Sequence, residues 1–171
     1  MYFFPNCFIS PKENIERQVP EWSKVKAQKD GQYWEAEAIA YRVEIGSSYK
    51  IGEIQANIFN EYGFLRENLS TGNIDPLIGK QKIPGSRTDT LYSRYITIMA
   101  DGDVTEDQFI VLEDEDNFID IQQLDMDKME MSGIFQVTFV RDANDRITNP
   151  SLPDTIRFTE GEFHLKIVNR N

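Results

Sequence analysis

Alternation of hydrophobic and polar positions dominates the chain from Trp22 onward. In a strand, successive side chains point to opposite faces, so a period of two indicates a strand with one buried face. The clearest run is 129–140. One face of that run carries Met129, Met131, Gly133, Phe135, Val137 and Phe139, and the other carries Glu130, Ser132, Gln136 and Thr138. No long segment shows the 3.6-residue period of a helix, so the pattern predicts an all-β protein.

Turn residues divide the alternating segments into separate strands. Asp30-Gly31, Gly46-Ser47-Ser48 and Asp101-Gly102 supply the φ > 0 positions that tight turns need. Strands are predicted at 25–28, 33–45, 51–62, 91–100, 107–112, 117–124, 129–140 and 156–167. The Gly- and Pro-rich stretch 63–90 predicts mostly loop, with 78–83 as an edge strand. About eight strands at regular spacing indicate a sandwich or a barrel. We expect an antiparallel β-sandwich of about seven to nine strands, immunoglobulin-like or of related Greek-key architecture.

Two strands carry further detail. In 33–45, Ala36, Ala38 and Ala40 share one face, so a bulky group is expected to pack there. In the last strand, Ile156 and Phe158 occupy even positions, whereas Phe163, Leu165 and Ile167 occupy odd ones. If both sets face the core, one extra residue lies between them, and Glu160-Gly161 is the expected β-bulge. A hairpin turn at the same place is the alternative.

Composition and charge limit the partners. The chain has 171 residues, of which 40% are hydrophobic, enough for a core. Its 18 basic and 29 acidic residues give a net charge of −11. That charge argues against nucleic-acid binding and against adsorption to anionic lipid. Residues 1–22, punctuated by three prolines, are expected to form a tail or leader, and residues 23–171 a single β-sandwich domain.

The single cysteine, Cys7, excludes an intrachain disulfide. No apolar run approaches the roughly 20 residues of a membrane-spanning helix. The apolar start at 1–9 lacks the basic region and the length of a signal peptide. Two interpretations stay open. Residues 1–9 are an ordinary tail, or the true start lies upstream and Cys7 belongs to a lipid-attachment site, for which Asn6 is a poor preceding residue.

Candidate chemistry is sparse. The only histidine, His164, is expected to face solvent or an adjoining loop, which argues against nucleophilic and zinc catalysis. The loop Asp101–Asp107 places acids at positions one, three and seven but lacks the other features of a calcium loop. We expect this loop and Glu113–Asp116 to be solvated turns. No pair of carboxylates and no phosphate-binding loop stands out. No catalytic, cofactor-binding or metal-binding residue is therefore assigned, and no cofactor is expected.

Three segments carry a family resemblance. They are Gly31–Ala36, of the form G-x-x-W-x-A, Met131–Phe139, of the form hydrophobic-S-G-x-F, and Thr159–Leu165, of the form T-x-G-x-F. In this order they resemble the small β-sandwich lipoproteins of unknown function common in Bacteroidetes. The resemblance implies a protein of the cell envelope, in the periplasm or on the outer membrane, and it implies no catalytic residues. The chain differs from that family in its missing signal and in the insertion at 63–90, so the cytoplasm stays an alternative.

Aromatic side chains offer a means of binding sugars by stacking. The candidates are Tyr33, Trp34, Tyr41, Tyr49, Tyr62, Tyr92 and Tyr95, most of them expected in the core or at its rim. The predicted function is a non-enzymatic cell-envelope accessory or ligand-binding module, with a glycan or an envelope protein as partner. The alternative is a calcium-dependent or carboxylate-based enzyme acting on glycans.

Overall fold

The computed structural model describes residues 19–88, 90–144 and 148–170, and all regular structure in these residues is β. Residues 1–18, including Cys7, lie outside them. The ten strands are β1 (Lys24–Lys29), β2 (Gln32–Ile45), β3 (Ser48–Phe59), β4 (Leu65–Ile74), β5 (Gly79–Lys82), β6 (Tyr92–Ile98), β7 (Thr105–Val111), β8 (Phe118–Asp125), β9 (Glu130–Arg141) and β10 (Thr155–Asn169).

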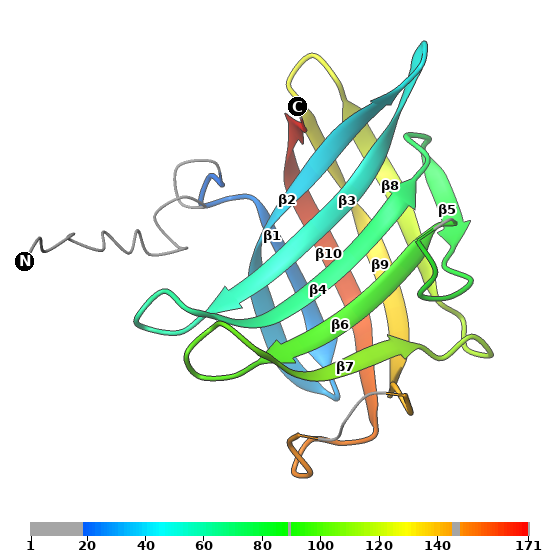
Figure 1. Ribbon diagram of the computed structural model, residues 1–171. Coiled ribbons are helices and arrows are strands. Elements are labelled where there is room, and N and C mark those ends of the chain that lie inside the picture. Colours follow the sequence, from blue (N-terminus) through cyan, green and yellow to red (C-terminus); the bar gives the residue numbers. More distant parts are fainter. Residues whose placement is uncertain (1–18, 89, 145–147, 171) are drawn as a thin grey trace, which may run out of the picture.

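The strands form one closed sheet (Figure 1). Antiparallel pairing runs through β1, β2, β3, β4, β6, β7, β9 and β10, and β10 returns to pair with β1. The end of β10 also runs parallel to part of β2, with Lys166 opposite Ile39. The all-β, antiparallel prediction is confirmed, but the predicted sandwich is wrong because the sheet closes into an eight-stranded barrel.

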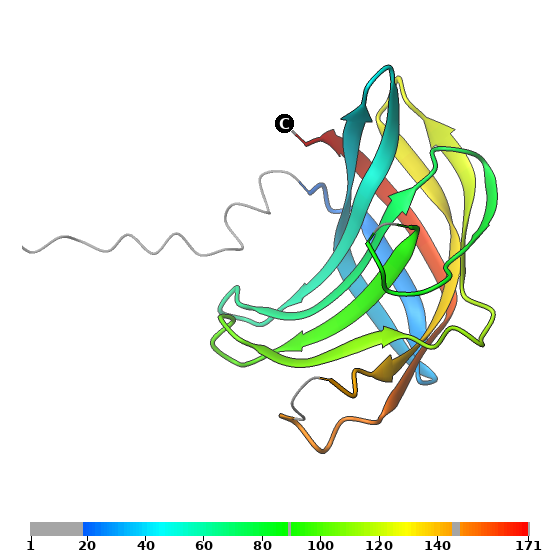
Figure 2. The same cartoon turned by 45° about the vertical axis from the view of Figure 1, so that its right-hand side comes forward.

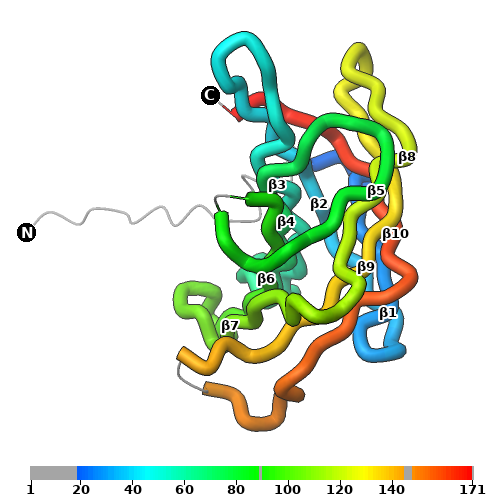
Figure 3. The backbone as a smooth tube through the Cα atoms, turned by 90° about the vertical axis from the view of Figure 1, so that its right-hand side faces the viewer, coloured from blue at the N-terminus to red at the C-terminus, as the bar shows by residue number. Residues whose placement is uncertain are grey.

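The remaining two strands extend this barrel on one side, seen in Figure 3, where β5 lies along β8. β7 and β8 pair one after the other with the same edge of β9. Residues 112–117 connect them and form the break between these two stretches of pairing. The loop after β5 is tied to this interruption, since the Ile83 amide donates to the Asn117 carbonyl. The Val111 amide likewise donates to Ser86 Oγ. The predicted edge strand at 78–83 is thus confirmed as β5.

Bulges bend the strands into the curvature seen in Figure 2. The predicted bulge in the last strand is confirmed: Phe158 lies opposite Val137 and Gly161 opposite Phe135, which leaves one extra residue in β10. Glu160 takes the strained φ of 50° at this point. The bulge keeps both apolar sets of β10 in the core, as the parity of the sequence required.

The inside of the barrel is filled. Trp34 and the three alanines of β2 share the inner face with the rings of Tyr95, Phe109, Phe139 and Phe158. The Trp34 and Phe158 rings meet edge to face with centroids 5.0 Å apart. A void of about 20 Å³ lies beside Ile54, Leu69 and Phe135. That void has room for about one water molecule, so among the described residues it is too small for a ligand.

The strand that the sequence missed is β4, within the stretch predicted as loop. Its sequence, LRENLSTGNI, carries polar residues on both faces. Glu67 is an inward position of β4, and its Oε2 accepts hydrogen bonds from Trp34 Nε1 at 2.9 Å and Tyr95 OH at 2.7 Å. Lys29 Nζ lies 2.9 Å from the same oxygen. A charged inward residue breaks the alternation that marks strands, and only its three partners explain why it is tolerated there.

Candidate functional site

A groove of about 700 Å³ lies on the outer face of the barrel. Its floor comes from outward positions of β2 and β3, chiefly Glu35, Glu37 and Asn57. Val19 to Glu21, just before β1, form one wall, and Phe59 adds an apolar surface. The groove exists because Ala36 and Ala38 turn into the core, so the intervening glutamates must face outward.

Glu35 is the centre of a small network at one end of the groove. Its carboxylate accepts hydrogen bonds from Lys24 Nζ and from Tyr33 OH, both at 2.5 Å. These two hydrogen bonds, that from Lys24 first, hold the pKa of Glu35 below its usual range. The same contact with Glu35 raises the pKa of Lys24. Glu35 is therefore ionised at neutral pH and occupied by neighbours, and it orients the Tyr33 ring.

Two other groups in the groove stay available to a ligand. Among the described residues, no side chain forms a hydrogen bond or ion pair with the Glu37 carboxylate. Asn57 lies directly across from Glu37 in the β2–β3 ladder. Its Oδ1 accepts a hydrogen bond from Asn68 Nδ2 at 2.7 Å, so its own NH₂ group is left to donate elsewhere. A carboxylate acceptor and an amide donor thus lie side by side on the groove floor.

The aromatic side chains considered for sugar stacking differ clearly in their exposure to solvent. Tyr33 is 67% exposed, and Tyr62, in the turn after β3, is 71% exposed. Trp34, Tyr92 and Tyr95 are buried, and Tyr41 and Tyr49 are half-buried and stacked on arginines. Of the predicted sugar-stacking residues, only Tyr33 is both exposed and next to the groove. The sequence signal for this site was the run of odd-numbered residues Tyr33, Glu35 and Glu37 opposite the alanines.

The acids of the loop Asp101–Asp107, which was expected to be a solvated turn, are not brought together. Asp101 and Asp103 are exposed at the turn between β6 and β7, whereas Asp107 is 1% exposed within β7. Asp107 Oδ1 forms an ion pair with Arg141 Nη1 at 2.5 Å. The Asp107 carboxylate also accepts hydrogen bonds from the amides of Thr148 and Asn149. Its role in the described structure is to fix the loop between β9 and β10 to the barrel.

Asp107→Asn is expected to lower the free energy of unfolding by about 2–4 kcal/mol, because it leaves the buried Arg141 guanidinium with only the exposed Asp154, 3.3 Å from its Nε, as a charge partner. Thermal melting should show the same loss with added calcium and with chelator. Asp103→Asn, at the exposed turn, is the matched control and should melt like the wild type. A rise of several degrees in the wild-type melting temperature on adding calcium, abolished by Asp107→Asn, would contradict this structural role.

His164 lies on the outer face, as predicted. Its ring centroid is 4.6 Å from that of Trp22, and its Nε2 is 3.5 Å from a Glu130 carboxylate oxygen. The second acidic cluster, Glu113–Asp116, is exposed between β7 and β8, and Asp116 pairs with Lys80 at 3.2 Å. Within the part of the chain that the structure describes, no three His, Cys, Asp or Glu side chains are grouped in a way that would hold a metal ion.

Comparison with known protein families, with curated proteins and with solved structures found no match for this chain. In residues 19–88, 90–144 and 148–170, no helix is long and apolar enough to cross a membrane. The function therefore has to be inferred from the groove and the filled barrel themselves.

Proposed function

We propose that this protein is a non-enzymatic ligand-binding module of the cell envelope that holds a glycan in the outer groove. The observation that carries the proposal is the pairing of a filled barrel with an open groove of about 700 Å³. Small barrels that bind ligands internally need an inner cavity, and here the remaining void is about the size of one water molecule. The outer groove offers far more space.

The chemistry of the groove suits a polyhydroxylated ligand. Glu37 accepts hydrogen bonds from sugar hydroxyls, and the Asn57 amide donates to hydroxyl or ring oxygens. The exposed Tyr33 ring, oriented by its hydrogen bond to Glu35, provides an aromatic face on which a sugar ring can stack. Three glutamates and one lysine line the groove, so it disfavours anionic ligands. A neutral glycan fits this set of groups best.

The ionisation of Glu35 supports binding in preference to hydrolysis. A glycosidase of the usual two-carboxylate type keeps one carboxylic acid protonated near neutral pH by raising its pKa. In this groove Lys24 and Tyr33 lower the pKa of Glu35 instead. Its oxygens are also held by these neighbours, so Glu35 is better suited to orient Tyr33 than to transfer a proton.

Binding should be measured by isothermal titration with neutral oligosaccharides of glucose, xylose, mannose and N-acetylglucosamine. At least one series is expected to bind. Tyr33→Ala should weaken that binding about tenfold through lost stacking, and Glu37→Gln by a similar factor through a lost charge-assisted hydrogen bond. Tyr62→Ala removes an equally exposed tyrosine outside the groove and should leave the affinity unchanged.

Absence of binding by every neutral series at millimolar protein would overturn the glycan proposal. Equal losses for Tyr33→Ala and Tyr62→Ala would place the sugar elsewhere. Release of shortened sugar products would favour the enzymatic alternative. The envelope setting is supported by the family resemblance alone, and fractionation of cells that express the full gene, including any in-frame upstream sequence, tests it.

A further inference from the structure

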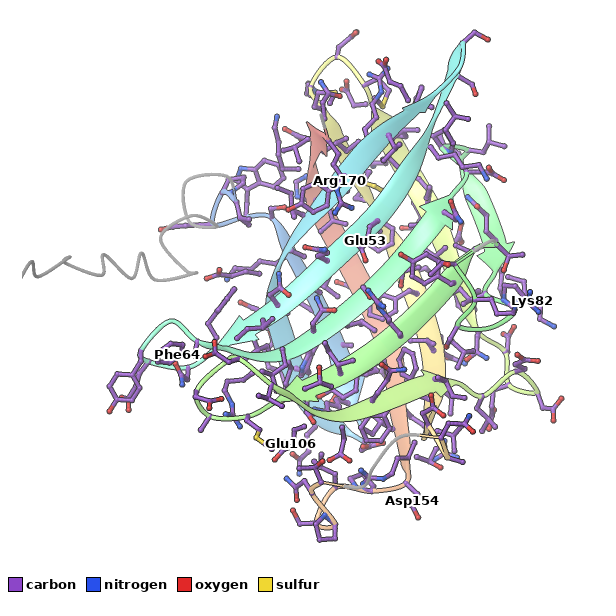
Figure 4. The ribbon with its side chains drawn as sticks, in the orientation of Figure 1. Glu53, Phe64, Lys82, Glu106, Asp154 and Arg170 are labelled. Carbon is purple, nitrogen blue, oxygen red and sulfur yellow. The ribbon has the colours of Figure 1, made fainter. Side chains whose placement is uncertain are left out.

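A second hollow, of about 240 Å³, opens on the outer face near the hairpin of β2 and β3 and the end of the described chain. Glu53, whose side chain is only 8% exposed, and Arg170 both line this hollow, and both are labelled in Figure 4. Gly52 has no partner in the β2–β3 pairing: Tyr41 lies opposite Glu53, and the next residue, Arg42, lies opposite Ile51. This bulge sends Ile51 into the core and still turns Glu53 outward.

The Glu53 carboxylate is buried but incompletely used. Gln55 Nε2 donates a hydrogen bond to it at 2.8 Å. The other contacts are longer: Tyr92 OH at 3.4 Å, Arg170 Nη1 at 3.6 Å and Arg94 Nη2 at 3.8 Å. A carboxylate offers about four acceptor positions, so it can take strong hydrogen bonds beyond the one from Gln55. A buried charge with spare capacity is unusual, because burial penalises incomplete pairing.

Cationic and apolar groups line the same hollow. Arg170 is 58% exposed, and Lys50 reaches it from β3, where its Nζ lies 3.4 Å from Asp75. Val43, the half-exposed Ile45 and the ring of Tyr92 form the apolar part of the lining. One buried carboxylate and two cations, Arg170 and Lys50, therefore line one hollow whose walls are partly apolar.

We propose that this hollow binds a small zwitterion with an apolar group, the chemistry of a free α-amino acid with a hydrophobic side chain. Its ammonium group donates to Glu53, its carboxylate binds Arg170 and Lys50, and its side chain packs against Val43, Ile45 and Tyr92. A simple cation would be repelled by Arg170 and Lys50, and a simple anion by Glu53. The hollow, of about 240 Å³, is on the scale of one amino acid.

The probes are L-leucine and L-phenylalanine, measured by isothermal titration and by chemical shifts of labelled protein. We expect saturable binding at about 1 mM or tighter for at least one of them. N-acetyl-L-phenylalanine lacks the ammonium charge and L-phenylalaninamide lacks the carboxylate, so each should bind at least tenfold more weakly than L-phenylalanine. Shifted amides should cluster around Glu53 and Gly52.

Variants separate recognition from folding. Arg170→Gln changes an exposed side chain and should weaken binding about tenfold in a protein that still folds, which its thermal melt checks. Glu53→Gln should abolish the preference for the free amine over the N-acetyl form. Arg157→Gln, an exposed arginine outside the hollow, is the matched control and should bind like the wild type.

Two results would overturn the proposal. Equal binding of L-phenylalanine and its N-acetyl derivative would show that Glu53 recognises no ammonium group and that the hollow binds only anions. No saturable binding of either amino acid by a folded wild-type protein would leave Glu53 as a structural ion-pair partner. Neither result bears on glycan binding in the groove, which uses other residues.

Discussion

Gly133→Ala is expected to lower the free energy of unfolding by more than about 4 kcal/mol. A Cβ atom at this position would lie 2.0 Å from the backbone oxygen of Asp120 and 2.7 Å from the ring of Phe163. The first contact is with the backbone of β8, the strand paired with β9, so no side-chain rotation can relieve it. In thermal melting, such a loss lowers the melting temperature by about 8–16 °C for a protein of this size.

Ser132→Ala is the matched control for this substitution. Ser132 is the preceding residue of β9, and its side chain points to the opposite face. We expect this variant to melt within about 2 °C of the wild type. If Gly133→Ala cost less than about 1 kcal/mol, the close pairing of β8 with β9 would be wrong, and with it the continuous path that β7 and β8 form along β9.

The second large effect is expected for Glu67→Ala, at about 3–5 kcal/mol of unfolding free energy. The substitution leaves the Lys29 ammonium, the Tyr95 hydroxyl and the Trp34 N–H without their common acceptor. Tyr95 is fully buried, and burial, followed by the Glu67 charge, raises its pKa. Denaturant unfolding of Glu67→Ala against Glu61→Gln, an exposed control in the turn after β3, measures the cost.

The pH dependence of this site has a definite sign. Burial alone would raise the pKa of Glu67, but the Lys29 charge and the hydrogen bonds from Lys29, Tyr95 and Trp34 lower it below the ordinary 4.5. The stabilisation from the ionised group is therefore present above about pH 4.5 and is lost as the pH falls through the lower folded value.

Glu67→Gln isolates this ionisation. The variant should be less stable than the wild type at pH 7, and the difference should shrink below about pH 4.5 as the wild-type carboxyl takes up a proton. A difference that stays constant from pH 7 to pH 3 would mean that Glu67 is not paired with Lys29 as the structure has it.

The strands with a regular pattern could be predicted because their burial is one-sided. In β9 up to Phe139 and in β10, every inward position is apolar or glycine, so period two and the extra residue at Glu160-Gly161 could be inferred from parity alone. β4 could not be predicted, since its inward Glu67 is stabilised by residues 28 to 38 positions away. Propensity and alternation contain no information about such distant partners.

The candidate sites follow the same division. The outward Tyr33, Glu35 and Glu37 can be placed on one face of β2 from the sequence, once the alanines are assigned to the core. The sequence does not show that Asn57 lies opposite Glu37, because that depends on the β2–β3 register. Nor does it show that Glu53 and Arg170 share a hollow, because the contact needs β10 to lie beside β2. The ion pair between Asp107 and Arg141 likewise depends on strand pairing, so the sequence, in which Asp107 is the last residue of an acidic loop, does not show it.

By itself the sequence determined an acidic, all-β protein with its main turns, most of its strands and, in 129–139 and 156–167, the inner face of the strand. These are local consequences of side-chain alternation and turn chemistry. Only the tertiary structure decided between sandwich and barrel, because both bury one face of each strand and present the same alternation. Closure depends on bulges and on β10 meeting β1, with Val25 opposite Phe163. That meeting joins residues nearly the whole domain apart, and it also fills the interior and places both candidate sites on the outside.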